Sequence, residues 1–345
     1  MAAEQIAVTP GAGSMLGPKA ERGVAEQDVA EQGVAEQGVA KKSVAAVVVT
    51  YNRKDLLLEC LDCLSRQELA GIAAGYELQV IVVDNASTDG TEQALAPLVE
   101  QGSIAYYNTG ENLGGAGGFN FGMRVAVERG HDYVWVMDDD CMTHPDTLRE
   151  LLLAGEGLEG EYGYLTSVCL WTDGTPCSMN RQRHPLHTTI EDFSPELQPC
   201  TLASFVSLFV PADVIAELGL PIKDFFIWTD DWEFTRRVSR RYPCYVVGTS
   251  IVTHKCKTNG AGNIALDSGE RIARFRLAYR NDIVLYRGEG AAGYVYVAAR
   301  DLNHLARILL EAKGRKLERA RAVVGGTLEG LRFHPQIEYV KRPEK

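Results

Sequence analysis

Three consecutive aspartates follow an apolar run in the stretch "YVWVMDDDCMTHPDTLREL", from Tyr133 to Leu151. Bare carboxylates are costly to bury, so some cation must neutralise them. Residues two apart in an extended segment point the same way, so Asp138 and Asp140 can converge on one ion. Carboxylate oxygens favour Mg²⁺ or Mn²⁺, which keep open positions for phosphate oxygens. The alternative is a capping cluster, since "THPDTLREL" reads as a helix start, but a helix start needs only one carboxylate.

A second acidic group stands in "FFIWTDDWEFTRR", where Asp230 and Asp231 begin a helix between Trp228 and Trp232. Acidic residues in a first turn often serve only the helix dipole. Large aromatic residues beside carboxylates commonly form a platform for sugar rings. A carboxylate that indoles partly desolvate has a raised pKa and can act as a general base. Packing of the two tryptophans into the core is the alternative.

Two further motifs are weak evidence alone but become stronger evidence of a binding site when an acidic metal site lies nearby. The glycines of "NTGENLGGAGGFNFGM" let backbone approach a ligand, and a helix expected to begin near Phe119 offers free N–H groups to an anion. Their spacing is neither that of a Walker loop nor that of a Rossmann loop. His254 follows the strand-like run "CYVVGTSIVT" and is a candidate third metal ligand, with a structural histidine as the alternative.

The segments that carry these motifs alternate between strand and helix. Apolar runs predict strands in "VAAVVVT", "ELQVIVV", "SIAYY" and "DYVWVM", with helices over 53–67, 91–100 and about 119–129. Such alternation indicates a parallel sheet covered on both faces, with ligands bound at the carboxyl ends of its strands. Thr50, Asp84, Asn108 and Asp138 fall at those ends.

The regular alternation of strands and helices ends after residue 160. "YGYLTSVCLW" and "TLASFVSLFVP" predict strands that flank a polar, irregular segment over about 172–200. Helices are expected in "VIAELGL" and "DDWEFTRRVSRR", and the chain reads as helical from Ser268 onward. We therefore expect a low-complexity leader over 1–43, a catalytic domain over 44–265 and a basic helical region over 266–345.

Composition limits the class of protein. The 345 residues carry a net charge of −11, which argues against non-specific nucleic-acid binding. Residues 271–345 hold 16 basic and 8 acidic side chains, so this region is net +8 and could meet an anionic membrane surface. Eight cysteines show no pairing rhythm, and the lone CxxC of Cys60 and Cys63 has no partner at zinc spacing. With no signal peptide or 18-residue apolar run, we expect a cytoplasmic protein with reduced thiols.

The motifs "VVVTYNRKDLL", "VIVVDNASTDGT", "NLGGAGGFNFG", "VMDDD" and "TDDWEFTRR", followed by a histidine, together resemble the inverting family two glycosyltransferases. The resemblance covers about residues 44–257 and is strongest to bacterial galactofuranosyltransferases, with rhamnosyltransferases as close relatives. It implies a GT-A fold of the α/β class, with a mostly parallel nucleotide-binding sheet. "RFRLAYRNDIVLYRG" is also similar to a rhamnosyltransferase segment. The chain lacks the extra N-terminal β-domain of the larger polymerising enzymes, which points to addition of one or a few sugars.

The resemblance also implies roles for individual residues. Metal ligands would be Asp138, Asp140 and His254; the base would be Asp231, with Asp230 as the close alternative. Trp228 and Trp232 would face the acceptor. Residues of the donor site would be Thr50, Tyr51, Arg53, Asp84, Asn112, Gly114 and Asp139. Asp84 would read the nucleobase, and where the family often has Glu-Asp this chain has Asp-Asp.

The expected reaction moves a sugar, galactofuranose from UDP-galactofuranose by preference, onto a glycan or polyprenyl-linked acceptor in cell-surface polysaccharide synthesis. Mn²⁺ or Mg²⁺ would be the cofactor, and the basic region a contact with the inner face of the membrane. A rhamnosyltransferase that uses dTDP-rhamnose is one alternative. A nucleotidyltransferase, which would release pyrophosphate, and a non-catalytic nucleotide-sugar binding module are the others. A homo-oligomer stays open.

Overall fold

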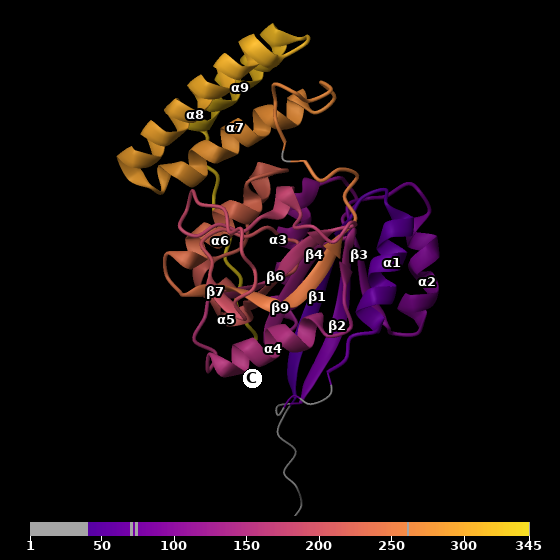
Figure 1. The fold of residues 1–345 in the computed structure, drawn as a ribbon. Helices are drawn as coiled ribbons and strands as arrows, with labels where there is room; N and C mark the ends of the chain where they lie inside the picture. Colours follow the sequence, from indigo (N-terminus) through magenta and orange to yellow (C-terminus); the bar gives the residue numbers. More distant parts are fainter. Residues whose placement is uncertain (1–40, 70–71, 73–74, 261, 345) are drawn as a thin grey trace, which may run out of the picture. The chain divides into compact units, whose positions relative to one another are not determined.

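A single mixed sheet runs through the protein (Figure 1). The computed structural model describes residues 41–69, 72, 75–260 and 262–344. In spatial order the strands are β3 (Ile104–Asn108), β2 (Tyr76–Asp84), β1 (Lys42–Thr50), β4 (Tyr133–Asp138), β8 (Leu208–Pro211), β6 (Tyr164–Trp171), β9 (Cys244–His254) and β5 (Cys141–Thr143), and β7 (Leu197–Pro199) pairs with β9. The first four strands are parallel, as the sequence predicted. Because β8 is antiparallel to both β4 and β6, the other half of the sheet is mixed.

Helices flank this sheet and continue beyond it. They are α1 (Lys54–Ser65), α2 (Thr91–Glu100), α3 (Gly114–Glu128), α4 (Thr147–Gly157), α5 (Ala212–Leu218), α6 (Asp230–Ser239), α7 (Ile272–Arg287), α8 (Gly290–Glu311) and α9 (Lys316–Arg332). Two short 3₁₀ turns, Ser178–Asn180 and Lys223–Phe225, interrupt the longer connections.

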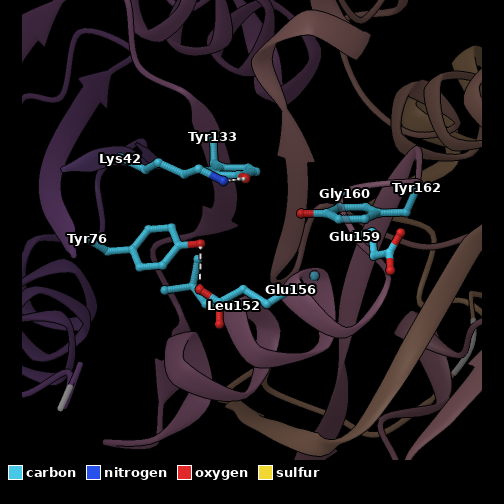
Figure 2. A pocket seen from close by; sticks show the side chains of 9 residues that line it. Lys42, Tyr76, Tyr133, Leu152, Glu156, Glu159, Gly160 and Tyr162 are labelled. Carbon is cyan, nitrogen blue, oxygen red and sulfur yellow. Dashed lines mark hydrogen bonds between the residues drawn. The ribbon is translucent and has the colours of Figure 1, made fainter. Parts of the chain in front are cut away.

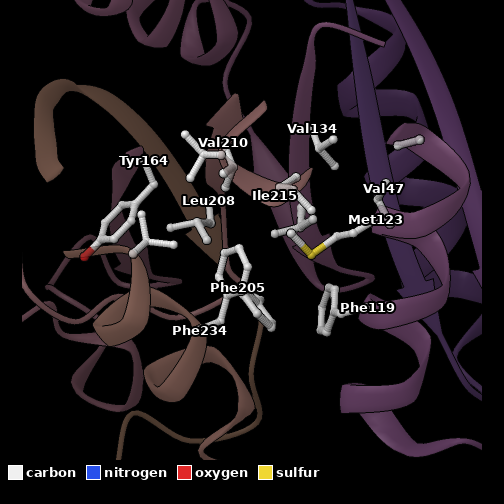
Figure 3. Packing of buried hydrophobic residues seen from close by; sticks show 14 of the residues in the cluster. Val47, Phe119, Met123, Val134, Tyr164, Phe205, Leu208, Val210, Ile215 and Phe234 are labelled. Carbon is white, nitrogen blue, oxygen red and sulfur yellow. The ribbon is translucent and has the colours of Figure 1, made fainter. Parts of the chain in front are cut away.

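The alternation of side chains along β1 explains why both faces of the sheet are covered. Successive strand residues point to opposite faces. Val47 belongs to a buried cluster with Phe119 and Met123 of α3, drawn in Figure 3. Val48 belongs to a different cluster, which includes Leu57 of α1. A strand that is apolar at every position is therefore buried on both sides.

Two expected boundaries were wrong. The helix expected near Phe119 begins at Gly114, because its glycines lie within the helix and let it pack closely on the sheet. A Cβ added at Gly118 would lie 2.5 Å from a methyl carbon of Val49. The strand expected in "TLASFVSLFVP" is limited to β8, because Ser207 has a φ of 61°, which an extended strand cannot contain.

The C-terminal helices α7, α8 and α9 pack on one another around Phe275, Tyr279, Ile308 and Val323. The helical region expected from Ser268 begins at Ile272. Most of the expected leader, residues 1–40, lies outside the described residues, and residues 42 and 43 already belong to β1. The division at residues 265 and 266 stays a prediction. Within the part of the chain that the structure describes, no helix has both the length and the apolar character to cross a bilayer.

Candidate active site

The carboxyl ends of the parallel strands gather the candidate residues at one edge of the sheet. The register pairs Thr50 of β1 with Asp84 of β2, and Asp138 ends the neighbouring strand β4. From the other half of the sheet, β9 pairs His254 with Cys141, directly after the aspartates. Side chains more than a hundred residues apart in sequence therefore meet at this edge.

Two of the three aspartates converge with the histidine. Asp138, Asp140 and His254 offer ligand atoms that all lie within 4.8 Å of one another. His254 Nε2 lies 2.9 Å from Asp140 Oδ1, and His254 Nδ1 donates to Asn180 Oδ1 at 2.8 Å. Such an outer hydrogen bond typically orients a metal-ligating imidazole. Two carboxylates and one imidazole suit Mn²⁺, and the carboxylates suit Mg²⁺, so these residues fit a divalent cation.

The middle aspartate points away from this cluster. Asp139 accepts a hydrogen bond of 2.7 Å from the Thr50 hydroxyl and one of 3.1 Å from Arg53 Nη1. The same Arg53 nitrogen donates to Asp140 Oδ2 at 2.7 Å. Thr50 and Arg53, which the sequence assigned to the donor site, thus hold the aspartates in place. Their contact with a nucleotide stays a prediction.

The protonation states of the aspartates and of His254 explain how buried carboxylates are tolerated at this site. Burial, followed by the charge of Asp140, raises the pKa of Asp138 to about 7, and burial raises the pKa of Asp139 to about 6. Burial also acts to raise the pKa of Asp140, but the hydrogen bond from His254 and the charges of His254 and Arg53 together outweigh it and keep that pKa below its usual range. Burial opposes charge on His254, yet its hydrogen bonds to Asp140 and Cys177 raise its pKa to about 10. The imidazolium and the Arg53 guanidinium therefore neutralise the group, and a metal ion would displace protons from it.

The second acidic pair begins α6. Asp230 is buried, and its burial raises its pKa to about 7. Burial also raises the pKa of Asp231, with further contributions from the charges of Asp230 and Asp138. The Trp232 backbone N–H donates to Asp231 Oδ1 at 2.7 Å and orients that carboxyl.

The loop that leads into this pair is strained. Three of its non-glycine residues have φ values in the left-handed region, 66°, 65° and 70°: Phe226, Trp228 and Thr229. Conformations of this kind persist only where surrounding contacts enforce them, and they concentrate at functional sites.

The enforcing contacts come from α7. The Asn281 side chain is fully buried, and its Nδ2 lies 3.1 Å from Phe225 O, 3.1 Å from Ile227 O and 2.9 Å from Trp228 O. Asn281 lies in the segment "RFRLAYRNDIVLYRG", but the sequence predicted no role for it. The available signal was an amide in the buried stripe of an otherwise apolar helix face.

A second contact ties the helix start to the C-terminal helices. The Thr229 hydroxyl donates to Asp282 Oδ1 at 2.7 Å, and Asp282 is paired with Arg300 of α8. Burial lowers the pKa of Arg300, but the charges of Asp282 and Asp301 outweigh that effect and raise it overall. The residue directly before the acidic pair is therefore held by an ion pair between α7 and α8.

The remaining donor-site candidates include Tyr51, Asn112 and Gly114. Tyr51 is 44% exposed, and the exposed Asn112 accepts a hydrogen bond of 2.9 Å from the Gly114 N–H. Gly114 has a φ of 71°, and a Cβ there would lie 2.0 Å from Phe226 O. The glycine at this position is required by close approach of the strained loop. The structure thus brings the glycine-rich segment and the strained loop into contact.

The buried Asp84 has protein partners of its own. The Ser87 N–H donates to Oδ1 at 2.8 Å, and the Tyr106 hydroxyl donates to Oδ2 at 2.7 Å. A nucleobase would have to share or replace the Tyr106 hydroxyl, so the reading of the base by Asp84 stays a prediction.

Each of the two tryptophans packs against the polypeptide. The Trp228 ring meets the Phe275 ring edge-on, with centroids 5.1 Å apart. The Arg183 guanidinium lies 4.2 Å from the centroid of a Trp232 ring. Both indoles remain partly exposed. These contacts account for both side chains as packing residues, and the acceptor role stays a prediction.

A pocket of about 280 Å³ lies elsewhere (Figure 2). Lys42, Tyr76 and Tyr133, which stand at the starts of β1, β2 and β4, line it together with residues of α4. The starts of parallel strands are the opposite edge of the sheet from the aspartates, so this pocket is separate from the candidate active site.

Comparisons with known proteins show similarity to glycosyltransferases. Residues 45–157 match the family model Glycosyl transferase family 2. The chain is 33% identical over 206 residues to galactofuranosyltransferase GlfT1 of Mycobacterium tuberculosis, which covers 56% of this chain and 64% of that protein. It is 28% identical over 223 residues to GlfT1 of Mycolicibacterium smegmatis, which covers 62% of this chain and 71% of that protein. The structure of GalNAc-T7 with UDP, GalNAc and Mn²⁺ superposes with a TM-score of 0.53 at 13% identity, covering 73% of this chain and 52% of that one.

Proposed function

We propose that this glycosyltransferase, which carries a family 2 domain on a GT-A fold, moves galactofuranose from UDP-galactofuranose to a glycan or polyprenyl-linked acceptor. Transfer would invert the anomeric carbon and serve the synthesis of a cell-surface polysaccharide. The observation that carries the proposal is the convergence of Asp138, Asp140 and His254 at the carboxyl edge of the parallel strands. The family match favours glycosyl transfer over the nucleotidyl transfer that the sequence left open.

Asp138, Asp140 and His254 are the residues that would hold Mn²⁺ or Mg²⁺. When bound, that ion supplies charge stabilisation for the leaving nucleoside diphosphate. His254 must release its Nε2 proton, and Asn180 keeps the ring oriented through Nδ1. Arg53 fixes Asp140 through the carboxylate oxygen that does not face His254. The Mn²⁺ and UDP in the GalNAc-T7 structure support a metal at a site of this fold.

Asp231 is the proposed general base. Its Oδ1 is held by the Trp232 N–H, so Oδ2 would accept the proton of the acceptor hydroxyl. That hydroxyl attacks the anomeric carbon from the face opposite the leaving diphosphate, which inverts the configuration and needs no covalent intermediate. Burial and the acidic neighbours raise the pKa of Asp231, as a general base requires. Asp230 is the alternative base, but it is buried, whereas Asp231 is partly exposed and so more accessible to an acceptor.

The choice of donor rests on the two galactofuranosyltransferases among the relatives. Tyr51, Asn112 and Gly114 would contact the donor, with Asp84 at the nucleobase. The rhamnosyltransferase alternative uses dTDP-rhamnose, and the two donors differ in both base and sugar.

The C-terminal helices would bring the enzyme to a membrane-bound acceptor. Four apolar residues of α8 are between 66% and 84% exposed: Val295, Leu302, Leu309 and Leu310. Residues seven apart lie on one helix face, and this face accompanies a region of net charge +8. A second copy of the chain is the alternative occupant. Flotation with liposomes should require anionic lipid and weaken with salt; flotation indifferent to both would contradict the membrane contact.

Thermal stabilisation by a panel of nucleotides and nucleotide sugars tests the donor and the metal together. UDP and UDP-galactofuranose should raise Tm with Mn²⁺ or Mg²⁺ and lose that effect with a chelator. Asp140→Asn should abolish the shift, whereas Asp146→Asn, at a half-exposed carboxylate outside the cluster, should retain it. Stabilisation by dTDP species would select the rhamnosyltransferase alternative. No metal-dependent shift with any donor would contradict the proposed function.

A further inference from the structure

A group of sulfur atoms lies on the Nδ1 side of His254. Cys169, Cys177 and His254 offer ligand atoms that all lie within 4.8 Å of one another. Cys177 Sγ is 3.7 Å from His254 Nδ1 and 3.8 Å from Cys256 Sγ. Cys169, Cys177 and His254 are at most 5% exposed, whereas Cys256 is half-buried, and all three thiols are free.

The backbone holds this group together. Cys169 lies in β6, which pairs with β9 through Trp171 and His254. The chain then turns back, so that the Cys177 N–H donates to Cys169 O at 2.9 Å. Cysteine spacing in the sequence gave no sign of the group, because its members are assembled by strand pairing and a turn.

The two separations from Cys177 match those of a tetrahedral metal site. Zinc–sulfur bonds of ~2.3 Å and zinc–nitrogen bonds of ~2.0–2.1 Å place two sulfur ligands ~3.8 Å apart and a sulfur and a nitrogen ligand ~3.5 Å apart. The observed separations from Cys177 are 3.8 Å and 3.7 Å. We propose that Cys169, Cys177 and Nδ1 of His254 form a binding site for a thiophilic divalent cation such as Zn²⁺, and that Cys256, which lies 3.8 Å from Cys177 but outside this group, turns to supply the fourth ligand.

Asn180 occupies the meeting point of these ligands. Its Oδ1 accepts hydrogen bonds from the Cys177 thiol at 3.2 Å and from His254 Nδ1 at 2.8 Å. Both donors therefore already point at one polar atom. Asn180 is partly exposed, so a cation can displace its side chain toward solvent without opening the core.

The site has a consequence for catalysis, and this part rests on the proposed function. His254 faces the aspartates with Nε2 and the thiols with Nδ1. A neutral imidazole that binds a cation through Nδ1 carries its proton on Nε2. Nε2 then has no electron pair for a metal at Asp138 and Asp140. Zn²⁺ at the thiols should therefore oppose Mn²⁺ at the aspartates.

Cobalt(II) tests the thiol site directly. The full-length, reduced protein should bind one equivalent of Co²⁺ with an intense near-ultraviolet thiolate-to-cobalt charge-transfer band. Cys177→Ser should abolish the band, whereas Asp140→Asn should keep it, because carboxylates give no such band. Cys63→Ser, at a half-buried thiol of α1, is the matched control and should also keep it.

Cys256→Ser provides a second variant at a more exposed thiol, should Cys177→Ser fold poorly. It should weaken the band, since the intensity follows the number of thiolate ligands. Absence of the band in the wild type, or an unchanged band in the folded Cys177→Ser or Cys256→Ser protein, would overturn the site. These readings do not depend on donor binding, so they stand apart from the proposed function.

Calorimetry tests the antagonism. One equivalent of Zn²⁺ should weaken Mn²⁺-dependent UDP binding about tenfold or more in the wild type and much less in Cys177→Ser. Equal weakening in the two proteins would contradict the sharing of His254.

Discussion

Replacing Asn281 by leucine tests whether α7 positions the strained loop that leads into the proposed base, Asp231. Leucine has a similar shape but no donors, so the substitution removes hydrogen bonds to Phe225 O, Ile227 O and Trp228 O. Phe225 O keeps a bond from Arg280 Nη2. The two other carbonyls lose a buried donor at about 1–3 kcal/mol each, so the loop conformation loses roughly 2–6 kcal/mol.

The observed loop conformation tolerates little loss of stabilising free energy. Its left-handed residues Phe226, Trp228 and Thr229 each cost about 1–3 kcal/mol, which favours relaxation once the contacts are gone. If about 2 kcal/mol of the loss acts on loop alignment, the aligned population falls about 30-fold, since 1.36 kcal/mol is a factor of ten. We expect kcat to fall about 10- to 100-fold, while Mn²⁺-dependent UDP affinity stays within about twofold because other elements bind the donor.

The matched control is Asn120→Leu. Asn120 is also a buried asparagine, and its Nδ2 donates to Pro221 O at 2.8 Å, outside the strained loop. Both variants should lower the urea midpoint, measured by circular dichroism, but only Asn281→Leu should lower kcat in a UDP-release assay at saturating substrates. Wild-type kcat in folded Asn281→Leu, or an equal loss in Asn120→Leu, would refute the positioning role.

Three further outcomes are expected from the site. Asp231→Asn should bind UDP normally in calorimetry but lose ~10²- to 10⁴-fold in turnover, and strong residual activity would move the base to Asp230. Asp140→Ala should lose metal-dependent donor binding, and unchanged affinity would contradict the metal assignment. The affinity for Mn²⁺ can be followed by the electron paramagnetic resonance signal of the free ion. It should rise about tenfold per pH unit between about pH 7 and 10, because the metal competes with one proton on His254 and that competition weakens as the pH approaches the pKa of His254. Below about pH 7 the dependence should steepen, because the metal must then also displace the proton of Asp138; a flat profile would contradict this linkage.

The parallel half of the fold was predictable because its strands are apolar on both faces and its helices follow at short intervals. That local periodicity placed Thr50, Asp84 and Asp138 at one edge of the sheet, where the register has them. The mixed half of the sheet was harder to predict from the sequence. The end of a strand at Ser207 depends on one residue in a left-handed conformation, and α3 begins early because its glycines meet Val49 and its neighbours on the sheet.

Prediction of the candidate site from the sequence had the same limit: local patterns do not report contacts between distant segments. Asp138, Asp140 and His254 could be selected by residue type and by resemblance, and the structure brings them together. The role of Asp139 could not, because its orientation toward Arg53 arises from the turn after β4. Asn281 acts on a loop more than 50 residues away, and no local pattern reports such a contact.

Manganese anomalous diffraction from crystals grown with UDP and Mn²⁺ tests the central claim most directly. The account predicts one strong anomalous peak bounded by Asp138, Asp140 and His254 Nε2, next to the diphosphate of the nucleotide. UDP bound at the carboxyl edge of the sheet without a peak there, or with the peak at other residues, would contradict it.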